Sequence, residues 1–366
     1  MASFIHITPN RESPSVSDTP FWNQPLPEPD ESIRAQAWQQ QGQLTKPPGS
    51  LGLLESLAVT LAAQQRTLTP SVQRVQISLF AADHGVRDEG ISAFPQSVTG
   101  QMLANFAGGG AAISVLARQL EARLEVIDMG VRTPPAVPGL INASLGQGSG
   151  NIAREPAMSR PVLEQALLAG EQAADRAWKQ STELFIAGEM GIGNTTSATA
   201  LACALLDARA EKLTGPGTGL DAGGVAHKAR VIDLALRRHG PDRDPLGLLQ
   251  SLGGFEIAAI TGALLGCAAR GIPVLVDGFI VTVAALAAVR IQLTLRPWLH
   301  FAHRSGEPGH GTVLKALQAR PLLELDMRLG EASGAAVAVP LLRAACQLHN
   351  QMASFEAAGV SNRSDT

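Results

Sequence analysis

The feature that most constrains the fold is a repeated alternation of short apolar runs with helical stretches rich in Ala and Leu. The clearest runs, rich in β-branched residues, span 75–82, 124–127, 184–187 and 273–276, and each is followed by a polar or Gly-rich break. Strands buried on both faces read as continuous apolar segments, and their alternation with helices is typical of βαβ units. The sequence therefore predicts an α/β fold with a mainly parallel sheet.

Each of the four runs ends, on its carboxyl side, in a carboxylate or a glycine. The residues at these breaks are Asp83, Asp128, Glu189 with the preceding Gly188, and Asp277 with Gly278. Ligands of open α/β sheets bind beyond the carboxyl ends of the strands. We therefore expect the four breaks to converge on one crevice.

The 366 residues exceed the usual size of one domain, so an appendage or a second domain is expected. We predict a loose, Pro-rich tail over 1–30, helical segments over 31–70 and 321–366, and an α/β nucleotide-binding core over 71–320. The tail lacks the basic start and the apolar stretch of a signal peptide. Two arrangements of the helical ends remain open: they pair as a smaller domain, or they cover the sheet.

Charge and cysteine content limit the partners. The chain has 29 Lys and Arg against 32 Asp and Glu, so no global basic field exists to hold a nucleic acid or an anionic membrane. The longest apolar stretch, 272–289, is interrupted by Asp277 and Gly278 and indicates a buried strand and helix rather than a membrane span. The three cysteines lack CxxC spacing. We expect a cytoplasmic protein.

A glycine-rich stretch at 188–196 follows the third run and precedes an Ala-rich helical segment. Backbone N–H groups of such a loop, with the N-terminus of the next helix, can bind an anion. Asn194 and Thr195 can cap that helix or bind phosphate oxygens. No Gly-Lys-Ser/Thr follows and the last glycine of GxGxxG is missing, so ATP and dinucleotide patterns are absent. The stretch is either a phosphate loop or a plain strand-to-helix turn.

A second glycine loop, 214–220, is followed by Lys228 in a helical stretch. Lysine is a mobile point charge suited to a phosphate, although a lone lysine is most often a solvated surface residue. Further on, Glu331 stands between small residues before an apolar helix, which suits a general base that works near neutral pH. The simpler interpretation of Glu331, a carboxylate facing the helix dipole, is favoured from the residues alone.

The histidines do not indicate a metal site. His300, His303 and His310 match no metal-binding spacing, and the residues between the last two are typical of a turn. His84 follows Asp83 at the end of a strand and is best interpreted as a hydrogen-bonded turn histidine. The residues alone thus indicate an α/β protein that binds a phosphorylated small molecule.

Several long motifs, in order along the chain, resemble those of the nicotinate-nucleotide:dimethylbenzimidazole phosphoribosyltransferase family. The motifs are LTKPPGSLG at 44–52, ADHGV at 82–86, the glycine stretch 188–196, GGFE at 253–256, VDGF at 276–279, RLGE at 328–331 and SGAA at 333–336. The resemblance runs from about residue 44 to 346. It implies a Rossmann-like, doubly wound sheet, a smaller helical domain from both chain ends, and a homodimer.

The resemblance also implies a reaction without metal or cofactor. The family moves the 5-phosphoribosyl group from nicotinate mononucleotide to 5,6-dimethylbenzimidazole and releases nicotinate. Glu331 would be the general base that takes the benzimidazole proton, and nearby carboxylates, Glu189 among them, would favour an oxocarbenium-like ribose. By the same resemblance, the phosphoribosyl group would lie against Glu189, Gly191, Gly193, Asn194, Thr195, Gly217, Lys228, Asp277, Gly278 and Ser305.

The acceptor pocket departs from the family pattern. Phe94 and Met102 stand where some members have Ser and Gln, which predicts a more apolar wall on which a planar base could stack. The preferred base is therefore left open among benzimidazoles, adenine and phenols. Two other functions remain as alternatives: a nucleotide-binding regulatory protein without turnover, which has no need of Glu331, and a nicotinamide-dependent oxidoreductase, which the absent GxGxxG disfavours.

Overall fold

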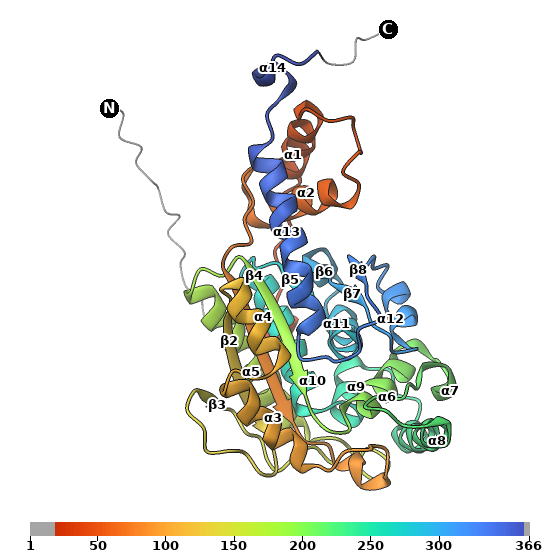
Figure 1. Ribbon diagram of the computed structural model, residues 1–366. Coiled ribbons are helices and arrows are strands. Elements are labelled where there is room, and N and C mark those ends of the chain that lie inside the picture. Colours follow the sequence, from red (N-terminus) through yellow and green to blue (C-terminus); the bar gives the residue numbers. More distant parts are fainter. Residues whose placement is uncertain (1–18, 362–366) are drawn as a thin grey trace.

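The computed structural model describes residues 19–361 and has a six-stranded sheet at its centre (Figure 1). All strand pairs in this sheet are parallel, in the order β3-β2-β1-β4-β5-β6. The strands are β1 Val75–Ala82, β2 Arg123–Gly130, β3 Leu140–Asn142, β4 Leu184–Met190, β5 Val274–Val276 and β6 Leu299–Phe301. The expected α/β fold with a mainly parallel sheet is confirmed. The order reverses between β1 and β4, where such sheets bind their ligands.

Helices cover both faces of the sheet, so it is doubly wound. Phe80 and Ala82 of β1 share one buried core with the helices α5, α6, α8, α9, α10 and α11, whereas Ile77 and Leu79 point to the other side and pack with α3, α4 and α13. The helices of the first face are α5 Arg160–Lys179, α6 Asn194–Leu206, α8 Ala222–His239, α9 Pro245–Leu252, α10 Phe255–Ala269 and α11 Phe279–Ile291. Those of the second are α3 Ser97–Ala107, α4 Ala112–Leu120 and α13 Ser333–Gln351.

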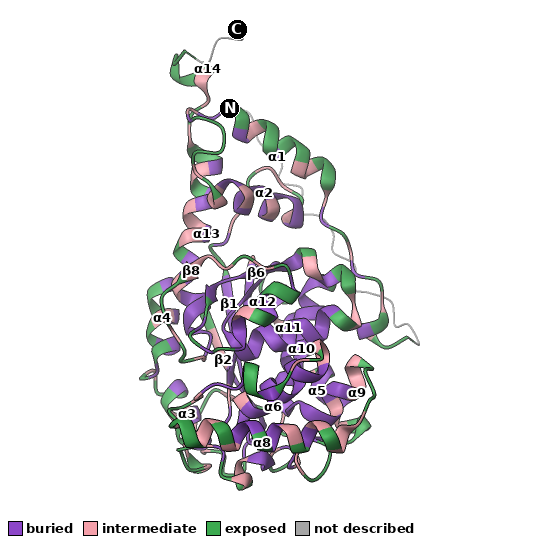
Figure 2. Ribbon diagram, turned by 90° about the vertical axis from the view of Figure 1, so that its right-hand side faces the viewer, coloured by how far each residue is buried: buried purple, intermediate pink, exposed green. Residues whose placement is uncertain are grey.

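The apolar stretch 272–289 forms β5 and α11, as the sequence indicates. Both α10 and α11 are apolar around their circumference because other elements surround them, and Figure 2 shows them in the buried interior. Within residues 19–361, none of the helices is long and apolar enough to cross a bilayer.

The two chain ends pair at one end of the molecule. The helices α1 Glu31–Gln43 and α2 Leu53–Gln65 pack beside α13 in the upper lobe of Figure 1. Leu57 of α2 contacts Ala345 of α13 in a small apolar cluster, and Gln41 is hydrogen-bonded to His349 at 2.8 Å. The first turns of α13 pack on the sheet instead, so this helix connects the lobe to the core. The exact domain boundaries remain a prediction.

The short elements complete the chain between these helices and strands. They are η1 Phe21–Asn23, η2 Gly85–Glu89, α7 Ala210–Leu213, η3 Leu293–Trp298, β7 His303–Arg304, α12 His310–Ala316, β8 Leu323–Glu324 and α14 Phe355–Ala358. The pair β7-β8 forms a separate two-stranded sheet next to the end of β6.

The prediction of a loose tail is wrong for residues 19–30. Trp22 and Leu26 are buried in the main core, and Trp298 donates a hydrogen bond from Nε1 to the carbonyl of Pro27 at 2.8 Å. Prolines remove backbone donors from this segment, but they leave Trp22 and Leu26 free to bury apolar area. The remainder of the predicted tail, residues 1–18, lies outside the described residues.

Candidate active site

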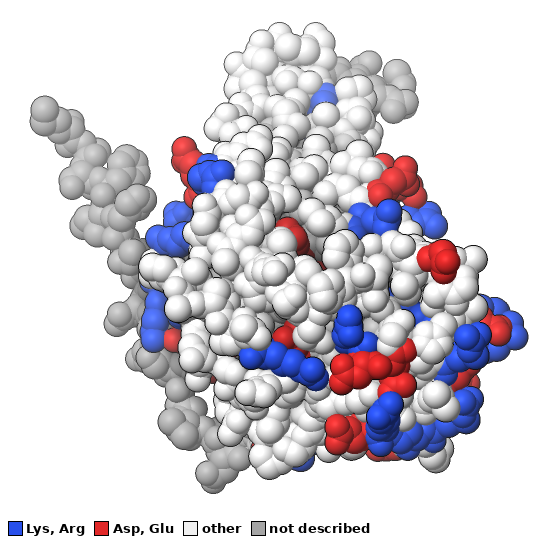
Figure 3. Space-filling model, turned by 60° about the horizontal axis from the view of Figure 1, so that its bottom comes forward, with Lys and Arg blue, Asp and Glu red and all other residues white. Residues whose placement is uncertain are grey.

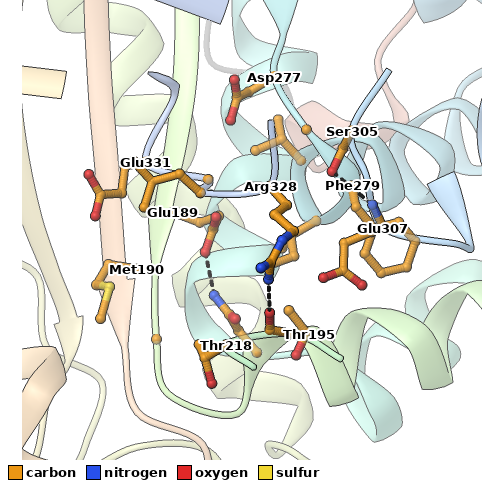
Figure 4. A pocket seen from close by; sticks show the side chains of 18 of the residues that line it. Glu189, Met190, Thr195, Thr218, Asp277, Phe279, Ser305, Glu307, Arg328 and Glu331 are labelled. Carbon is orange, nitrogen blue, oxygen red and sulfur yellow. Dashed lines mark hydrogen bonds between the residues drawn. The ribbon is translucent and has the colours of Figure 1, made fainter. Parts of the chain in front are cut away.

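A cavity of about 500 Å³ opens beyond the carboxyl ends of β4 and β5 (Figure 4). Its walls come from the turn after β4, the start of α11, the segment between β7 and α12, and the loop that precedes α13. Its lining includes these predicted residues: Phe94, Glu189, Gly191, Asn194, Thr195, Gly217, Asp277, Gly278, Ser305 and Glu331. A second cavity of about 20 Å³ adjoins it and adds Gly193 and Lys228.

The expected convergence of four strand ends holds for two of them. Glu189, near the carboxyl end of β4, and Asp277, directly after β5, line the cavity. Asp128 instead accepts hydrogen bonds from the N–H groups of Gly130 and Val131 at 2.9 and 2.8 Å in its own turn. Asp83 is buried and accepts hydrogen bonds from the Gln96 side chain and the Arg132 backbone. Local partners therefore turn both carboxylates away from the cavity.

The two glycine loops meet around Lys228. This lysine is only 1% exposed, and its Nζ donates to Thr195 Oγ1 at 2.8 Å, so it is not a surface residue. Burial lowers the pKa of Lys228 to about 8, against the opposing effect of the Glu307 carboxylate. Gly217 lies at φ +53°, and a Cβ there would stand 3.2 Å from Nζ. The small cavity thus offers a cation, a hydroxyl and backbone groups to an anion.

The first glycine loop rests on His84. The Cβ of any side chain at Gly191 would stand 2.3 Å from the carbonyl oxygen of Ala82, and Gly193 lies at φ +100° directly above His84. His84 is fully buried, with Nδ1 3.0 Å from Ser197 Oγ and Nε2 2.6 Å from Glu256 Oε1. The interpretation of His84 as a hydrogen-bonded turn histidine is therefore confirmed.

Helix α6 begins without the predicted side-chain cap. Its N-cap is Gly193, and the Asn194 amide donates a short hydrogen bond to Glu189 instead (Figure 4). Burial, followed by the negative charges of Glu256, Asp277 and Glu331, raises the pKa of Glu189 well above its ordinary value.

Glu331 lies on the turn before α13 with a left-handed backbone, φ +63°. Its side chain lines the cavity, although the residue is only 6% exposed. Burial and the charge of Asp277 raise the pKa of Glu331 to about 7. A carboxyl group with this pKa can accept and release a proton near neutral pH, as a general base requires.

Asp277 anchors the turn that carries Glu331. Its Oδ1 accepts a hydrogen bond from the backbone N–H of Ala335, in the first turn of α13, at 2.7 Å. Burial raises the pKa of Asp277, and the neighbouring His303, whose Nε2 lies 3.8 Å from Oδ1, opposes this effect.

Several lining residues were missed from the sequence: Met190, Ile192, Thr218, Phe279, Ile280, Val281, His303, Glu307, Arg328, Leu329 and Gly330. Arg328 belongs to a motif already noted, and its Nη1 donates to the carbonyl of Gly217 at 3.2 Å. Glu307 lies in a segment interpreted only as a turn. Burial raises its pKa, whereas Lys228 and Arg328 lower it. In the sequence, the charged residues scattered over 306–328 were the one feature that could have pointed to Glu307 and Arg328.

The two apolar residues expected at the acceptor pocket separate. Phe94 lines the cavity and is 45% exposed. Met102 lies on α3, packs against the core on that face of the sheet, and lines neither cavity. Met190 and Leu329 supply apolar surface next to Glu331 instead.

The three C-terminal histidines have separate partners. His300 is hydrogen-bonded to Gln64 at 2.8 Å, and His310 lies 3.0 Å from the Thr282 hydroxyl and accepts the N–H of Ser305.

On the face that Figure 3 shows, charged side chains are mixed in sign. Lys and Arg are interspersed with Asp and Glu, and the centre is largely uncharged.

Comparisons with known proteins agree with this site. A sequence model described as a phosphoribosyltransferase matches residues 26–360. A curated relative from Pseudomonas putida, named nicotinate-nucleotide:dimethylbenzimidazole phosphoribosyltransferase, is 58% identical over 345 residues, which are 94% of this chain and 98% of the relative. A relative of the same name from Xanthomonas axonopodis pv. citri is 58% identical over 335 residues, 91% of this chain and 96% of its own.

A solved structure shares the fold over nearly the whole chain. The nicotinate-nucleotide:dimethylbenzimidazole phosphoribosyltransferase from Thermus thermophilus superposes with a TM-score of 0.87 at 44% identity, covering 91% of this chain and 100% of that chain. The glycine loops, the buried Lys228 and the cavity-lining Glu331 thus occur in a chain similar to these enzymes along almost its full length, and the chain belongs to the nicotinate-nucleotide:dimethylbenzimidazole phosphoribosyltransferase family.

Proposed function

We propose that this enzyme transfers the 5-phosphoribosyl group of nicotinate mononucleotide to 5,6-dimethylbenzimidazole, which gives nicotinate and α-ribazole 5′-phosphate for the lower-ligand nucleotide of cobalamin. The observation that carries the proposal is the pairing, in adjoining cavities, of a small cationic pocket at Lys228 with a carboxyl group, Glu331, of pKa about 7. The relatives with this activity in their names support it.

The phosphate of the donor would bind where the two cavities adjoin. Lys228 supplies the positive charge there, Thr195 a hydroxyl, and Gly193 and Gly217 allow the backbone to approach the phosphate. The N-terminus of α6 adds a favourable dipole. We assign Asn194, Gly191, Gly278 and Ser305 to the ribose and to its phosphate because all four line the larger cavity.

The carboxylates would stabilise positive charge on the ribose. Nicotinate mononucleotide carries a pyridinium leaving group, so its ribose becomes oxocarbenium-like as the bond to the ring breaks. Glu189 and Asp277 line the cavity and would face this charge. Attack from the face opposite to the leaving base converts the β-linkage into an α-linkage. This route uses no metal ion and no cofactor.

Glu331 would act on the acceptor. It takes the N–H proton of the benzimidazole, so the other ring nitrogen gains the electron density that it needs to attack C1 of the ribose. Phe94, Met190 and Leu329 lie along the same cavity and would hold the planar base by stacking and apolar contact.

The two other functions considered have less support. A regulatory protein without turnover has no need of a base such as Glu331, and the relatives carry the names of enzymes. A nicotinamide-dependent oxidoreductase is disfavoured because the glycine loop after β4 lacks the dinucleotide pattern.

The test is one incubation of the purified protein with nicotinate mononucleotide and separate acceptors: benzimidazoles, adenine and phenols. Mass spectrometry would detect released nicotinate and the new nucleotide. We expect transfer to dimethylbenzimidazole, reduced by 10²- to 10⁴-fold in Glu331→Ala, the usual contribution of a general base. Binding of the donor without transfer to any acceptor would support the regulatory alternative.

Lys228→Ala tests the phosphate pocket. Loss of a charged hydrogen bond of about 1.5–3 kcal/mol should weaken the binding of nicotinate mononucleotide by about 10- to 100-fold, measured by calorimetry. Lys212→Ala, an exposed lysine on α7, is the matched control and should bind normally. Unchanged affinity of Lys228→Ala would remove this lysine from the site.

We also propose that the enzyme acts as a homodimer in the cytoplasm on small molecules, without a nucleic-acid or membrane partner. The net charge of −3 and the absence of a basic excess support the last point. Light scattering of the eluting peak in gel filtration would give the oligomeric state, and a monomer mass would reject the dimer.

A further inference from the structure

A buried chain of three hydrogen-bonded side chains lies beneath the first glycine loop, and the proposed mechanism does not use it. Ser197 of α6, His84 just after β1 and Glu256 of α10 are linked through the imidazole: Ser197 Oγ lies 3.0 Å from Nδ1, and Glu256 Oε1 lies 2.6 Å from Nε2. His84 and Glu256 belong to the sequence motifs ADHGV and GGFE, and Ser197 directly follows the glycine stretch. Three separate motifs thus meet at this chain.

The order of the three side chains is that of a serine, histidine and carboxylate relay, but they are sealed from any substrate. Ser197, His84 and Glu256 are each 0% exposed, and none of the three lines either cavity. A nucleophile or base has to reach the reacting atoms. The chain therefore acts on the site by positioning other groups.

The imidazole is wedged between two glycine turns. A Cβ at Gly191, in the loop above it, would stand 3.4 Å from Nε2, and a Cβ at Gly254, just before α10, would collide with Cε1. Gly193, the N-cap of α6, lies over the same residue: a Cβ there would stand 3.2 Å from His84 Cβ. The glycines therefore let the loop rest directly on His84, which fixes its height above the sheet.

The bond to Ser197 fixes the first turn of α6. Asn194 and Thr195, at the start of the same turn, line both cavities, so the N-terminus of α6 lies where the two cavities adjoin. Ser197 comes from that turn and meets the imidazole of His84, which belongs to another part of the chain. A shift of this helix end relative to the sheet would therefore have to break the bond.

Stability alone does not account for the chain. Glu256 Oε2 is buried and has no hydrogen-bond partner within residues 19–361. Burying a carboxyl group that is only partly hydrogen-bonded costs free energy, and apolar side chains of similar volume would often fill such a space at lower cost. Apolar side chains could not supply a directed hydrogen bond to Ser197, which the imidazole does supply.

We propose that His84 and Ser197 are positioning residues for the donor: the imidazole, oriented by Glu256, holds the first turn of α6 where it binds the phosphate of nicotinate mononucleotide. The inference rests on the proposed binding of that phosphate at α6. In the tautomer with the proton on Nε2, the ring donates to Glu256, and Nδ1 accepts the hydroxyl proton of Ser197. Without the hydroxyl, Nδ1 loses its partner and the helix end is free to shift away from the phosphate.

The test measures the binding of nicotinate mononucleotide to the full-length protein by calorimetry. Ser197→Ala removes the hydroxyl and little volume, and it should weaken donor binding by about tenfold, the equivalent of one lost hydrogen bond. At saturating donor, kcat should change by less than about twofold, because the variant leaves Glu331 and the apolar wall untouched. KM for the donor should rise with the dissociation constant.

Ser114→Ala is the matched control. It also removes a buried serine hydroxyl, which donates to the carbonyl of Phe106 at 3.0 Å, but it does so on α4, on the other face of the sheet. This variant should bind the donor normally. An equal loss of donor binding in Ser114→Ala and Ser197→Ala would show a general effect of destabilisation and would overturn the proposal.

Two substitutions of His84 separate its two bonds. The amide of Gln reaches about as far as Nε2, toward Glu256, whereas the amide of Asn stands near the position of Nδ1, toward Ser197. His84→Gln should therefore weaken donor binding about as much as Ser197→Ala, and the double variant should be no weaker, because both changes break the same bond. His84→Asn should bind the donor more tightly than His84→Gln.

Additive losses in the double variant, or normal donor binding by Ser197→Ala, would overturn the proposal. If the His84 variants fail to fold, Ser197→Ala and its control decide alone. Amide hydrogen exchange adds a readout that needs no ligand: the amides of 191–197 should exchange about tenfold faster in Ser197→Ala and at the normal rate in Ser114→Ala. Equal protection in both would also overturn the proposal. Failure of the unaltered protein to bind the donor would instead refute the proposed function.

Discussion

Glu331→Gln should make the protein more stable at alkaline pH while it removes the proposed base. The folded chain raises the pKa of this carboxyl group from 4.5 to about 7, so the folded state binds the proton more tightly than the unfolded state. Stability therefore falls as the pH rises between these values, and the loss is complete above about 7. At 1.36 kcal/mol for each unit of pKa, the ionised group destabilises the fold by up to about 3 kcal/mol.

The assay is urea unfolding at pH 5 and pH 8. Gln is nearly isosteric with a protonated Glu, and it keeps the backbone strain at φ +63° equal in both proteins. We expect the two proteins to be nearly equally stable at pH 5, and the variant to be more stable by up to about 3 kcal/mol at pH 8. Glu211→Gln, an exposed carboxyl on α7, is the control and should show no such change. A variant that is equally or less stable than the parent at pH 8 would refute the reasoning.

Two further predictions concern packing and a buried ion pair. Gly330→Ala and Gly139→Ala both place a side chain at a left-handed position, φ +80° and +82°, and each should cost about 1 kcal/mol. Only at Gly330 does the new Cβ meet Glu189, at 2.2 Å, so only this variant should lose more than about tenfold in kcat. Glu55→Gln breaks the buried pair with Lys46, 2.8 Å apart, and should destabilise the protein by about 3 kcal/mol at pH 7. Burial raises the pKa of Glu55, but the opposing effects of Lys46 and a backbone N–H are larger in sum, so the pKa lies below its ordinary value of 4.5. The stability difference between the two proteins, measured by urea unfolding, should therefore shrink as the pH falls below about 4.5.

The parallel sheet and the two carboxylates at its edge were predictable from the sequence. The runs at β1, β2, β4 and β5 are continuous because α10 and the helices of the other face exclude water from both sides. A polar residue directly after such a run has to leave the sheet at its carboxyl edge, which is why Glu189 and Asp277 were found.

Side chains outside that edge were harder to predict because their direction depends on contacts between distant segments. Nothing near Lys228 in sequence shows that Thr195 accepts its hydrogen bond, so the sequence favoured a lysine exposed at the surface. His303 and Glu307 lie on short segments without periodicity. Met102 was assigned to the acceptor pocket because it stands where some family members have Gln, but on α3 it packs against the core.

Lys228 and Glu331 have shifted pKa values, about 8 and about 7, for the same reason: burial disfavours the charged form of each. The proposed donor carries the charges that reverse both shifts, with an anionic phosphate for Lys228 and a cationic pyridinium ring near the carboxylates. Binding of the donor should therefore hold Lys228 protonated and favour ionisation of Glu331. The carboxyl group of Glu331, the proposed base, would then be fully ionised only when the ribose to be attacked is already bound. Removal of the acceptor's proton before the donor has bound is thereby disfavoured.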